Sequence, residues 1–521
     1  MSAIFILAFT VALQPALAQE VSAGITGTVV DQGGAPVKAA TITAKDMDRG
    51  TSLSAETNDS GAFNFSRVPV ATYQVKVEAK GFQSQVLPRV TLVLNQVARF
   101  DFKLKVGQVT ESVHVTTEAP LLQTDTTLVG SIVDSRTATD LPLSTHNTNQ
   151  LTLVSGPGVI TPNLFGFQAA QNTFGTGRPY VNGAREQENN FILDGMDNNQ
   201  SDNNDVGYVP APEAVQEFNL ITSNAPADFG NYLGGVVNVT LKSGTNQYHG
   251  DLYEFMRRGG WNANSWSNNL NGIPRPGMHY DNFGATVGGP ILRNKLFFFT
   301  DFAGSQWSQP STTAQLQTIP LAQRTGDFSA LLAQGIQLYD PASSANPATR
   351  TPFLNNQIPV GRFSNAAKAI INSSFYPSTQ LANNVSRFTT NSYQGDAKID
   401  WVPSERDHVM GRWSQQGVEA PNTNSIALLG NSDRTFPLKN FVVDETHTFT
   451  PNLLNDARIG FSYFPVTEGF SNPTGQNLPQ VFGIAGVSDT FLPAITFTGP
   501  GTQPGTIGNN DLVQSFHDTT L

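Results

Sequence analysis

Cysteine is absent from the 521 residues, and charged side chains are scarce. Without cysteine, neither a disulfide framework nor a cysteine-based metal site or nucleophile is available. Asp, Glu, Lys and Arg together make up 14% of the chain, compared with about 25% in typical soluble domains. The net charge is −11, so the chain lacks the basic excess that nucleic-acid-binding proteins show. The composition therefore excludes a disulfide-stapled scaffold and argues against nucleic acid as a partner.

Catalytic motifs are missing as well. The seven histidines are scattered, and no zinc-peptidase motif, GxSxG nucleophile elbow or Gly-rich phosphate loop occurs. The Asn- and Asp-rich run 194–205 invites a calcium interpretation, but it has no Gly at the sixth position from Asp197 and so fails the EF-hand pattern. We interpret it as a solvated loop. The sequence predicts a protein that is not an enzyme, with no catalytic, cofactor-binding or metal-ligating residues and no cofactor.

Glycine, phenylalanine and small polar residues are abundant instead, with 46 Gly and 34 Phe. This composition suits secreted all-β domains or an outer-membrane barrel. An apolar run at 3–13, followed by the small-x-small sequence at 16–18, predicts a signal peptide over residues 1–18. No Lys or Arg precedes the run, so either the true start lies upstream or the signal is atypical. The alternative is a buried N-terminal strand.

Short strands separated by turn residues follow over 21–105. Tyr73, Val75 and Val77 alternate with polar residues, a pattern that is typical of an antiparallel β-sandwich with one buried face. The order of GxVxD, GxPVxxA, DxxGxF and YxVxVxAxGF motifs resembles the carboxypeptidase regulatory-like domain, which has a transthyretin- or prealbumin-like fold. These motifs lie at 27–31, 34–40, 59–65 and 73–82. The resemblance implies an accessory module without peptidase activity, and carbohydrate contact stays open as an alternative.

Four further motifs occupy residues 106–246. They are a DLP segment at 140–142, an LDG turn at 193–195, a VxEF strand at 215–218 and a GGVVNVTLKSGTN closing strand at 234–246. In this order, behind the sandwich, they resemble the plug domain of TonB-dependent outer-membrane receptors of the Oar-like group. The resemblance implies an α+β plug over 106–246.

Local structure within this plug region is predicted from the residues themselves. A short strand is expected at 213–222, a turn-rich connection at 224–235 and a β-branched strand at 236–241. Gly234 and Gly235 predict a bend or a close backbone approach where a Cβ atom would clash. If the region is a plug, strand 236–241 should lie inside the arc of a barrel and not in its wall.

The resemblance also implies a partner-binding segment between the sandwich and the plug. In this family the segment there pairs as an added strand with a periplasmic TonB-type protein. The alternative is a simple linker strand. The residues of the possible TonB-contact segment are Thr110, Glu111, Ser112, Val113, His114 and Val115.

Alternation becomes the main signal over 247–521. A polar face with Asp396, Lys398 and Asp400 opposes an aromatic face with Tyr393 and Trp401. A lipid-facing barrel strand with a wet lumen has this pattern, and so does a soluble sandwich. On the barrel reading, Asp396 and Asp400 are lumen-facing polar residues.

Connection lengths favour the barrel. Tight turns at 290–294, 403–405 and 450–452 alternate with long polar stretches at 258–279, 305–391 and 415–439, as in outer-membrane barrels. About eight strands are predicted, too few to enclose a plug, since plugged transporters have about 22. We therefore expect 247–521 to be the first part of an incomplete antiparallel transmembrane β-barrel. The chain would be a C-terminally truncated fragment whose sheet is open and curved.

The overall fold class is thus all-β dominated, with a sandwich, a plug and barrel strands. The function implied by the resemblance is a TonB-dependent receptor in the cell outer membrane, exported by its signal peptide. It would take up a substrate, energised through a periplasmic TonB-type partner, with outer-membrane lipid around it. The alternative is a secreted or surface adhesin built of β-sandwiches that binds carbohydrate. The sequence identifies neither the substrate, with glycan or peptide as the options, nor the residues that bind it.

Overall fold

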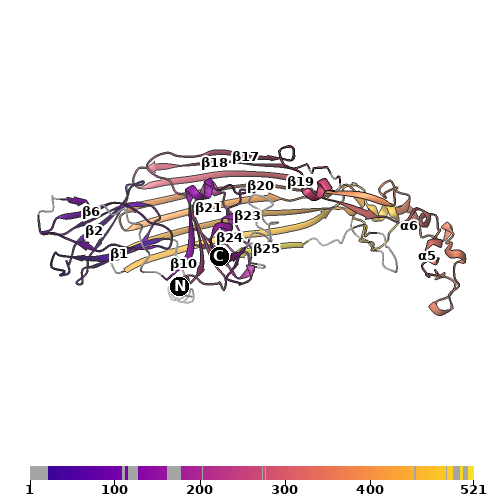
Figure 1. Ribbon diagram of the computed structural model, residues 1–521, viewed down its shortest axis with the longest axis horizontal. Helices are drawn as coiled ribbons and strands as arrows, with labels where there is room; N and C mark the ends of the chain where they lie inside the picture. The colour runs from indigo at the N-terminus through magenta and orange to yellow at the C-terminus, as the bar shows by residue number, and fades with distance from the viewer. Residues whose placement is uncertain are drawn as a thin grey trace, which may run out of the picture.

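The computed structural model describes residues 22–107, 112–114, 127–160, 178–201, 204–270, 272, 274–275, 277–450, 453–487, 490–496, 505–508 and 514–520. The predicted signal peptide at 1–18 lies outside the described residues. Strands dominate and form three units, here called the sandwich, the middle unit and the wall (Figure 1). None of the helices within the described ranges has the length and apolar character needed to cross a membrane.

The sandwich consists of two sheets around an apolar core. One sheet has the order β4-β1-β7, with β8 also pairing β1, and the other has the order β3-β2-β5-β6-β9. On β5, Tyr73, Val75 and Val77 are buried and the intervening residues are half-exposed, which confirms the predicted alternation. The strands are β1 (Ala23–Val30), β2 (Thr41–Asp46), β3 (Ser52–Glu56), β4 (Ala62–Val68), β5 (Thr72–Glu78), β6 (Ser84–Thr91), β7 (Val97–Arg99), β8 (Phe102–Lys103) and β9 (Ser112–His114).

The middle unit is built on a five-stranded sheet of order β10-β15-β16-β13-β14. Its strand β16 is buried at every position and belongs to this sheet, not to the wall, as predicted. The elements are β10 (Val129–Asp134), α2 (Ser135–Asp140), η1 (Thr148–Val154), β11 (Val159–Ile160), β12 (Tyr180–Val181), η3 (Glu186–Glu188), β13 (Asn190–Leu193), β14 (Met196–Asp197), η4 (Pro212–Ala214), β15 (Val215–Ser223) and β16 (Val236–Leu241).

Two local predictions in the middle unit have different outcomes. The strand expected at 213–222 starts two residues later, because Pro212 opens a 3₁₀ turn, for which its fixed φ is suited. The prediction for the glycine pair is confirmed. A Cβ atom would lie 2.5 Å from the Asn189 side-chain oxygen at Gly234 and 2.9 Å from a Val181 methyl group at Gly235. The backbone carbonyl oxygens of Glu188 and Ile221 would lie at 3.2 and 3.1 Å, so a Cβ atom at either glycine would crowd backbone as well as side-chain atoms.

The wall is one antiparallel sheet of order β17-β18-β19-β20-β21-β23-β24-β25, with the short β22 pairing β20 and β23. The described sheet runs from β17 at one edge to β25 at the other and is open, as predicted (Figure 1). The strands are β17 (Leu252–Arg258), β18 (His279–Leu292), β19 (Leu296–Gln317), β20 (Leu381–Ser404), β21 (Asp407–Glu419), β22 (Asn422–Asn424), β23 (Asn431–Thr450), β24 (Leu453–Ser471) and β25 (Gln514–Thr520).

The two faces of the wall differ as the sequence predicts. Asp396, Lys398 and Asp400 are buried on the inner face, whereas Tyr393 and Trp401 on the same strand are 44% and 47% exposed on the outer face. The outer face therefore presents aromatic and aliphatic groups, and the polar groups are turned toward the middle unit. This is the arrangement that a wall strand between lipid and a polar interior requires.

The loops predicted at 305–391 and 415–439 are shorter than expected. Strand β19 continues to Gln317 and β20 begins at Leu381, so the connection between them covers 318–380. Similarly, β21 continues to Glu419 and β23 begins at Asn431. The far ends of these strands carry Ser, Thr, Asn and Gln on both faces. Trp307 and Phe388 pack together there, but apolar residues are too sparse for the sequence to predict a strand.

The two ends of the wall strands carry different structures. The tight turns lie at the end beside the sandwich, and α5 and α6 lie at the opposite end (Figure 1). At that far end, connections between strands pack into a lobe around Tyr376, Leu428 and Phe482. The helical elements of the wall region are η5 (Gly259–Trp261), α3 (Trp266–Leu270), α4 (Leu321–Arg324), α5 (Ser329–Leu332), η6 (Pro347–Thr349), η7 (Leu354–Asn356), η8 (Val360–Arg362), α6 (Asn365–Ile371), η9 (Ala427–Leu429) and α7 (Leu478–Phe482).

Candidate functional site: the interface between the middle unit and the wall

The LDG turn between β13 and β14 places an aspartate at the surface of the middle unit that faces the wall. Asp194 has a φ of 46° and Gly195 a φ of 78°, left-handed conformations that Asp tolerates and Gly adopts freely. The Leu241 N–H donates to Asp194 Oδ1 at 3.1 Å and fixes the carboxylate against β16. The turn thus presents one fixed negative charge.

Two cations of the wall meet this carboxylate. Lys398 Nζ lies 3.0 Å from Asp194 Oδ1, and Arg412 Nε lies 3.2 Å from Asp194 Oδ2. The Arg412 side chain is completely buried, and those of Lys398 and Asp194 are nearly so. Removing one partner from a buried ion pair leaves an uncompensated charge and costs about 3–5 kcal/mol. The position of the middle unit on the wall therefore depends on the pairing of Asp194 with Lys398 and Arg412.

A tyrosine of the middle unit forms a second polar contact with the wall. The Tyr208 hydroxyl donates to Asp396 Oδ2 at 2.5 Å, and Tyr208 has no exposed surface. Burial, together with the neighbouring negative charge of Asp396, holds the pKa of Tyr208 well above its usual range. The phenol is therefore neutral and remains a hydrogen-bond donor at any physiological pH.

An arginine of β24 reaches the backbone of the same LDG turn. Arg458 donates to the Gly195 carbonyl at 2.9 Å and forms an ion pair with Asp444 at 2.5 Å. A Cβ atom at Gly195 would lie 2.2 Å from the Arg458 guanidinium. Glycine at position 195 thus allows both the left-handed turn and the close approach of Arg458.

Apolar packing and further polar contacts complete the interface. Phe218 of β15 and Phe299 of β19 belong to one buried cluster that spans the two units. The His146 ring lies 2.8 Å from Glu213 and packs on Phe255 of β17 with 4.3 Å between ring centroids. Mixed interfaces of this kind hold two units in register, and their polar groups regain water contacts on separation. The geometry suits a domain that is held firmly and can still be displaced.

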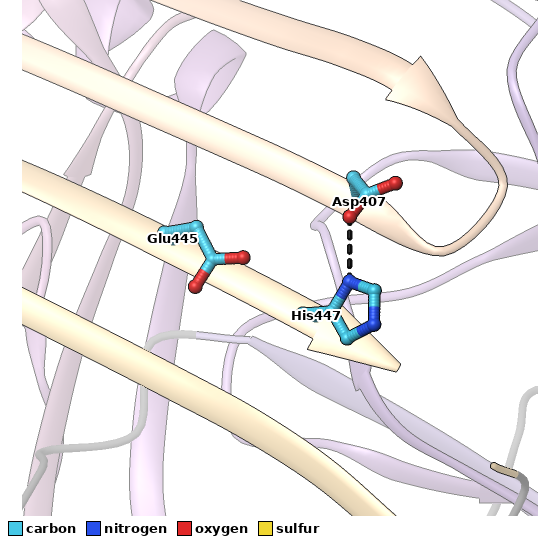
Figure 2. Close-up of side chains that lie close together, drawn as sticks. All are labelled: Asp407, Glu445 and His447. Atoms are coloured by element: carbon cyan, nitrogen blue, oxygen red, sulfur yellow. Dashed lines mark hydrogen bonds and ion pairs between the residues drawn. The ribbon is translucent and has the colours of Figure 1, made fainter. Parts of the chain in front are cut away.

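A different cluster on the wall has the composition of a metal site. Asp407 of β21 and Glu445 and His447 of β23 have potential ligand atoms within 4.8 Å of one another (Figure 2). However, His447 Nδ1 lies 2.6 Å from Asp407 Oδ1, and the Ser404 hydroxyl donates to the other oxygen of Asp407. This ion pair accounts for the arrangement. Sequence reasoning missed the cluster because it depends on the register that pairs Asp407 with His447.

The predicted TonB-contact segment is described only in part. Thr110, Glu111 and Val115 lie outside the described residues. The residues between them form β9, which pairs in parallel with β6 at the edge of the sandwich. In this structure the segment therefore has strand geometry, and its assignment as a partner-binding segment stays a prediction.

Family profiles match two parts of the chain. Residues 240–520 match the outer membrane beta barrel domain, and residues 24–105 match the carboxypeptidase regulatory-like domain. Because the first match covers more than half of the 521 residues, the chain belongs to the outer membrane β-barrel family. It is an outer-membrane protein with an N-terminal regulatory-like domain, which confirms the resemblance found in the sequence.

Individual proteins that this chain resembles include two transporters and a receptor. The TonB-dependent transporter Oar of Myxococcus xanthus is 26% identical over 302 residues, which cover 54% of this chain and 27% of the relative. The chain therefore spans about a quarter of the length of that relative. Among solved structures, the outer membrane transporter YddB from Escherichia coli has 12% identity and a TM-score of 0.43, covering 75% of this chain and 43% of that one. BauA, the ferric preacinetobactin receptor from Acinetobacter baumannii, has 10% identity and a TM-score of 0.36, covering 66% and 48%.

The adhesin alternative predicts further β-sandwiches after residue 247. Beyond that point the structure has one wall sheet instead, whose polar inner face is covered by the middle unit. The tandem-sandwich architecture is therefore wrong for this region. The wall buries charged side chains that a soluble sandwich would replace with an apolar core.

Proposed function

We propose that the chain forms the plug and part of the barrel wall of a TonB-dependent outer-membrane transporter. In this proposal the middle unit is the plug, and it moves relative to the wall to let a substrate pass. The observation that carries the proposal is the charge-matched contact of Asp194 with Lys398 and Arg412, on the inner face of a wall whose outer face is aromatic. The similarity to a TonB-dependent transporter supports it.

Energy for this movement would come from a periplasmic TonB-type protein. The segment from Thr110 to Val115 is its proposed contact, because an extended segment can add as a strand to a partner sheet. Its Ser112–His114 part already has strand geometry. The substrate class, for which glycan and peptide are the candidates, is left to experiment.

The test is binding of a purified periplasmic TonB-type domain to the full-length protein in detergent. We expect Val113→Pro to abolish binding, because proline removes a backbone N–H that strand pairing requires. Val113→Thr keeps the N–H and the β-branched shape and serves as the matched control. Equal binding by both variants would refute the assigned contact segment.

Membrane assembly is a separate requirement of the proposal. The full-length protein should fractionate with the outer membrane and should migrate differently on gels before and after boiling, as folded barrels do. A protein that folds in water without detergent from residue 247 onward would contradict the proposal.

A further inference from the structure

The sandwich lies at the end of the wall strands that is opposite α5 and α6 (Figure 1). It contacts the wall through an ion pair: Arg67 of β4 lies 2.8 Å from Asp456 of β24. The side chains are 16% and 6% exposed, so the pair is largely shielded from water. Shielded charge pairs contribute more to an interface than exposed ones do.

The sandwich also binds the middle unit. The Leu94 N–H donates to Glu217 Oε2 of β15 at 2.6 Å, and the Asn219 side-chain amide approaches the Leu94 carbonyl at 3.5 Å. Leu94 is fully buried although it lies in a connection of the sandwich. A single connection of the sandwich therefore rests directly on β15 of the middle unit.

A third set of contacts holds the segment that leads from the middle unit into the wall. Arg49 Nε donates to the Gly244 carbonyl at 3.3 Å, and the Asn246 side chain donates to the Arg49 carbonyl at 2.5 Å. The Asn246 N–H donates to the Asp48 carbonyl at 3.0 Å. The β2–β3 turn of the sandwich thus holds this connecting segment through hydrogen bonds.

Behind these contacts lies a cavity of about 110 Å³ that all three units line. The sandwich contributes Arg49 and Arg67, the middle unit contributes Gln216, and the wall contributes Asp400 and Asp444. Asp400 Oδ2 and Asp444 Oδ1 have no hydrogen-bond partner although both atoms are buried. Their other oxygens are paired: Asp400 Oδ1 lies 3.3 Å from His408 Nε2, and Asp444 Oδ2 lies 2.5 Å from Arg458. The acidic side of the cavity belongs to the wall, and the sandwich places two arginines opposite it.

We propose that the sandwich is an intramolecular cap that locks the middle unit to the wall and closes this charged cavity. Because the sandwich bonds to both units, the middle unit cannot move along the wall until one set of contacts is broken. Release of the cap would withdraw Arg49 and Arg67 from the wall carboxylates and widen access to the cavity. The gating consequence rests on the proposed transport function, whereas the capping itself does not.

The test measures access to the cavity in the full-length protein in detergent. The described chain contains no cysteine, so Gln216→Cys introduces a single thiol at the cavity. In this background, Arg67→Asp places two negative charges opposite each other, and we expect maleimide labelling to become roughly tenfold faster because the cap opens. Arg67→Lys keeps a positive charge beside Asp456 and should retain slow labelling.

The control is Lys38→Asp, which reverses one charge of the exposed pair with Asp59 on the sandwich surface and should leave the labelling rate unchanged. Unchanged labelling in Arg67→Asp, with the gel-mobility shift of the folded wall retained, would overturn the cap. Equal labelling rates in Arg67→Lys and Arg67→Asp would do the same. Equal partner binding by Val113→Pro and Val113→Thr would refute the assigned contact segment and leave the cap intact.

Discussion

Glu217 gives the sandwich contact a dependence on pH. It lies on β15, almost wholly buried, and its Oε2 accepts the Leu94 N–H. Burial raises the pKa of its carboxyl from 4.5 to about 8; the Leu94 hydrogen bond lowers it and the charge of Asp134 raises it further. The folded protein therefore holds a proton that the unfolded chain releases near pH 4.5.

The sign follows from which state binds the proton more tightly. Between pH 4.5 and about 8 the folded state holds more protons than the unfolded state, so stability falls as the pH rises. The full stabilisation is present below pH 4.5, the pKa of Glu217 in the unfolded chain, and it is lost once the pH reaches about 8, the pKa in the folded protein. At about 1.4 kcal/mol for each pH unit, the upper bound of the loss is about 5 kcal/mol.

Glu217→Gln removes this titration and keeps an oxygen that can accept the Leu94 N–H. We expect the first unfolding transition of the full-length protein in detergent to depend less on pH in this variant. The unfolding temperatures of variant and wild type should diverge from pH 5 to pH 8, with the variant more stable, and the difference should stay constant above pH 8.

The matched control is Glu56→Gln, which replaces an exposed glutamate on β3 of the sandwich. The unfolding temperature of this variant should change with pH in the same way as that of the wild type. Parallel pH profiles for Glu217→Gln and the wild type would refute the buried, protonated carboxyl. In the Gln216→Cys background, cavity labelling that is slower with Glu217→Gln than without it at pH 9, and equal at pH 6, would connect the proton to the cap itself.

Three further predictions concern the wall. Asp194→Asn keeps the left-handed turn but removes the charge, and should destabilise the middle unit by about 3–5 kcal/mol in thermal unfolding. Adding Lys398→Met should recover part of the loss. An unchanged unfolding transition in Asp194→Asn would contradict the ion pair. Gly244→Ala places a Cβ atom 2.4 Å from the Phe298 carbonyl oxygen and should reduce the yield of gel-shifting protein, whereas Gly277→Ala, in open space, should not. Zinc should leave the unfolding temperature unchanged, because the His447 ring is already paired; a rise that His447→Ala abolishes would show a metal site.

Much of the fold follows from local pattern. Alternation on β5 and β20 correctly predicts which residues are buried, because each strand has one wet and one apolar face. The glycine pair 234–235 signals a close backbone approach that the structure confirms. Where apolar residues are sparse, as in the far part of β19, the alternation disappears and the sequence predicts a loop in place of the strand.

The candidate site was predictable only in part. The sequence identifies Asp396, Lys398 and Asp400 as one polar face, and it identifies the LDG motif by resemblance. It does not show that Asp194 meets Lys398, since 204 residues separate them and many other aspartates are chemically equivalent. The contact depends on how the middle unit seats against the wall.

By itself, the sequence determined the class of the protein: the absence of cysteine and of catalytic motifs, the sandwich, the plug-like motifs and the two-faced strands. These features are local, because each depends on residues a few positions apart. The tertiary structure alone decided the ion pair at Asp194, the cluster at Asp407 and the contacts that the sandwich makes with Asp456 and Glu217. These depend on strand register and on the packing of whole units, which are set by the sum of many contacts and not by any short stretch of chain.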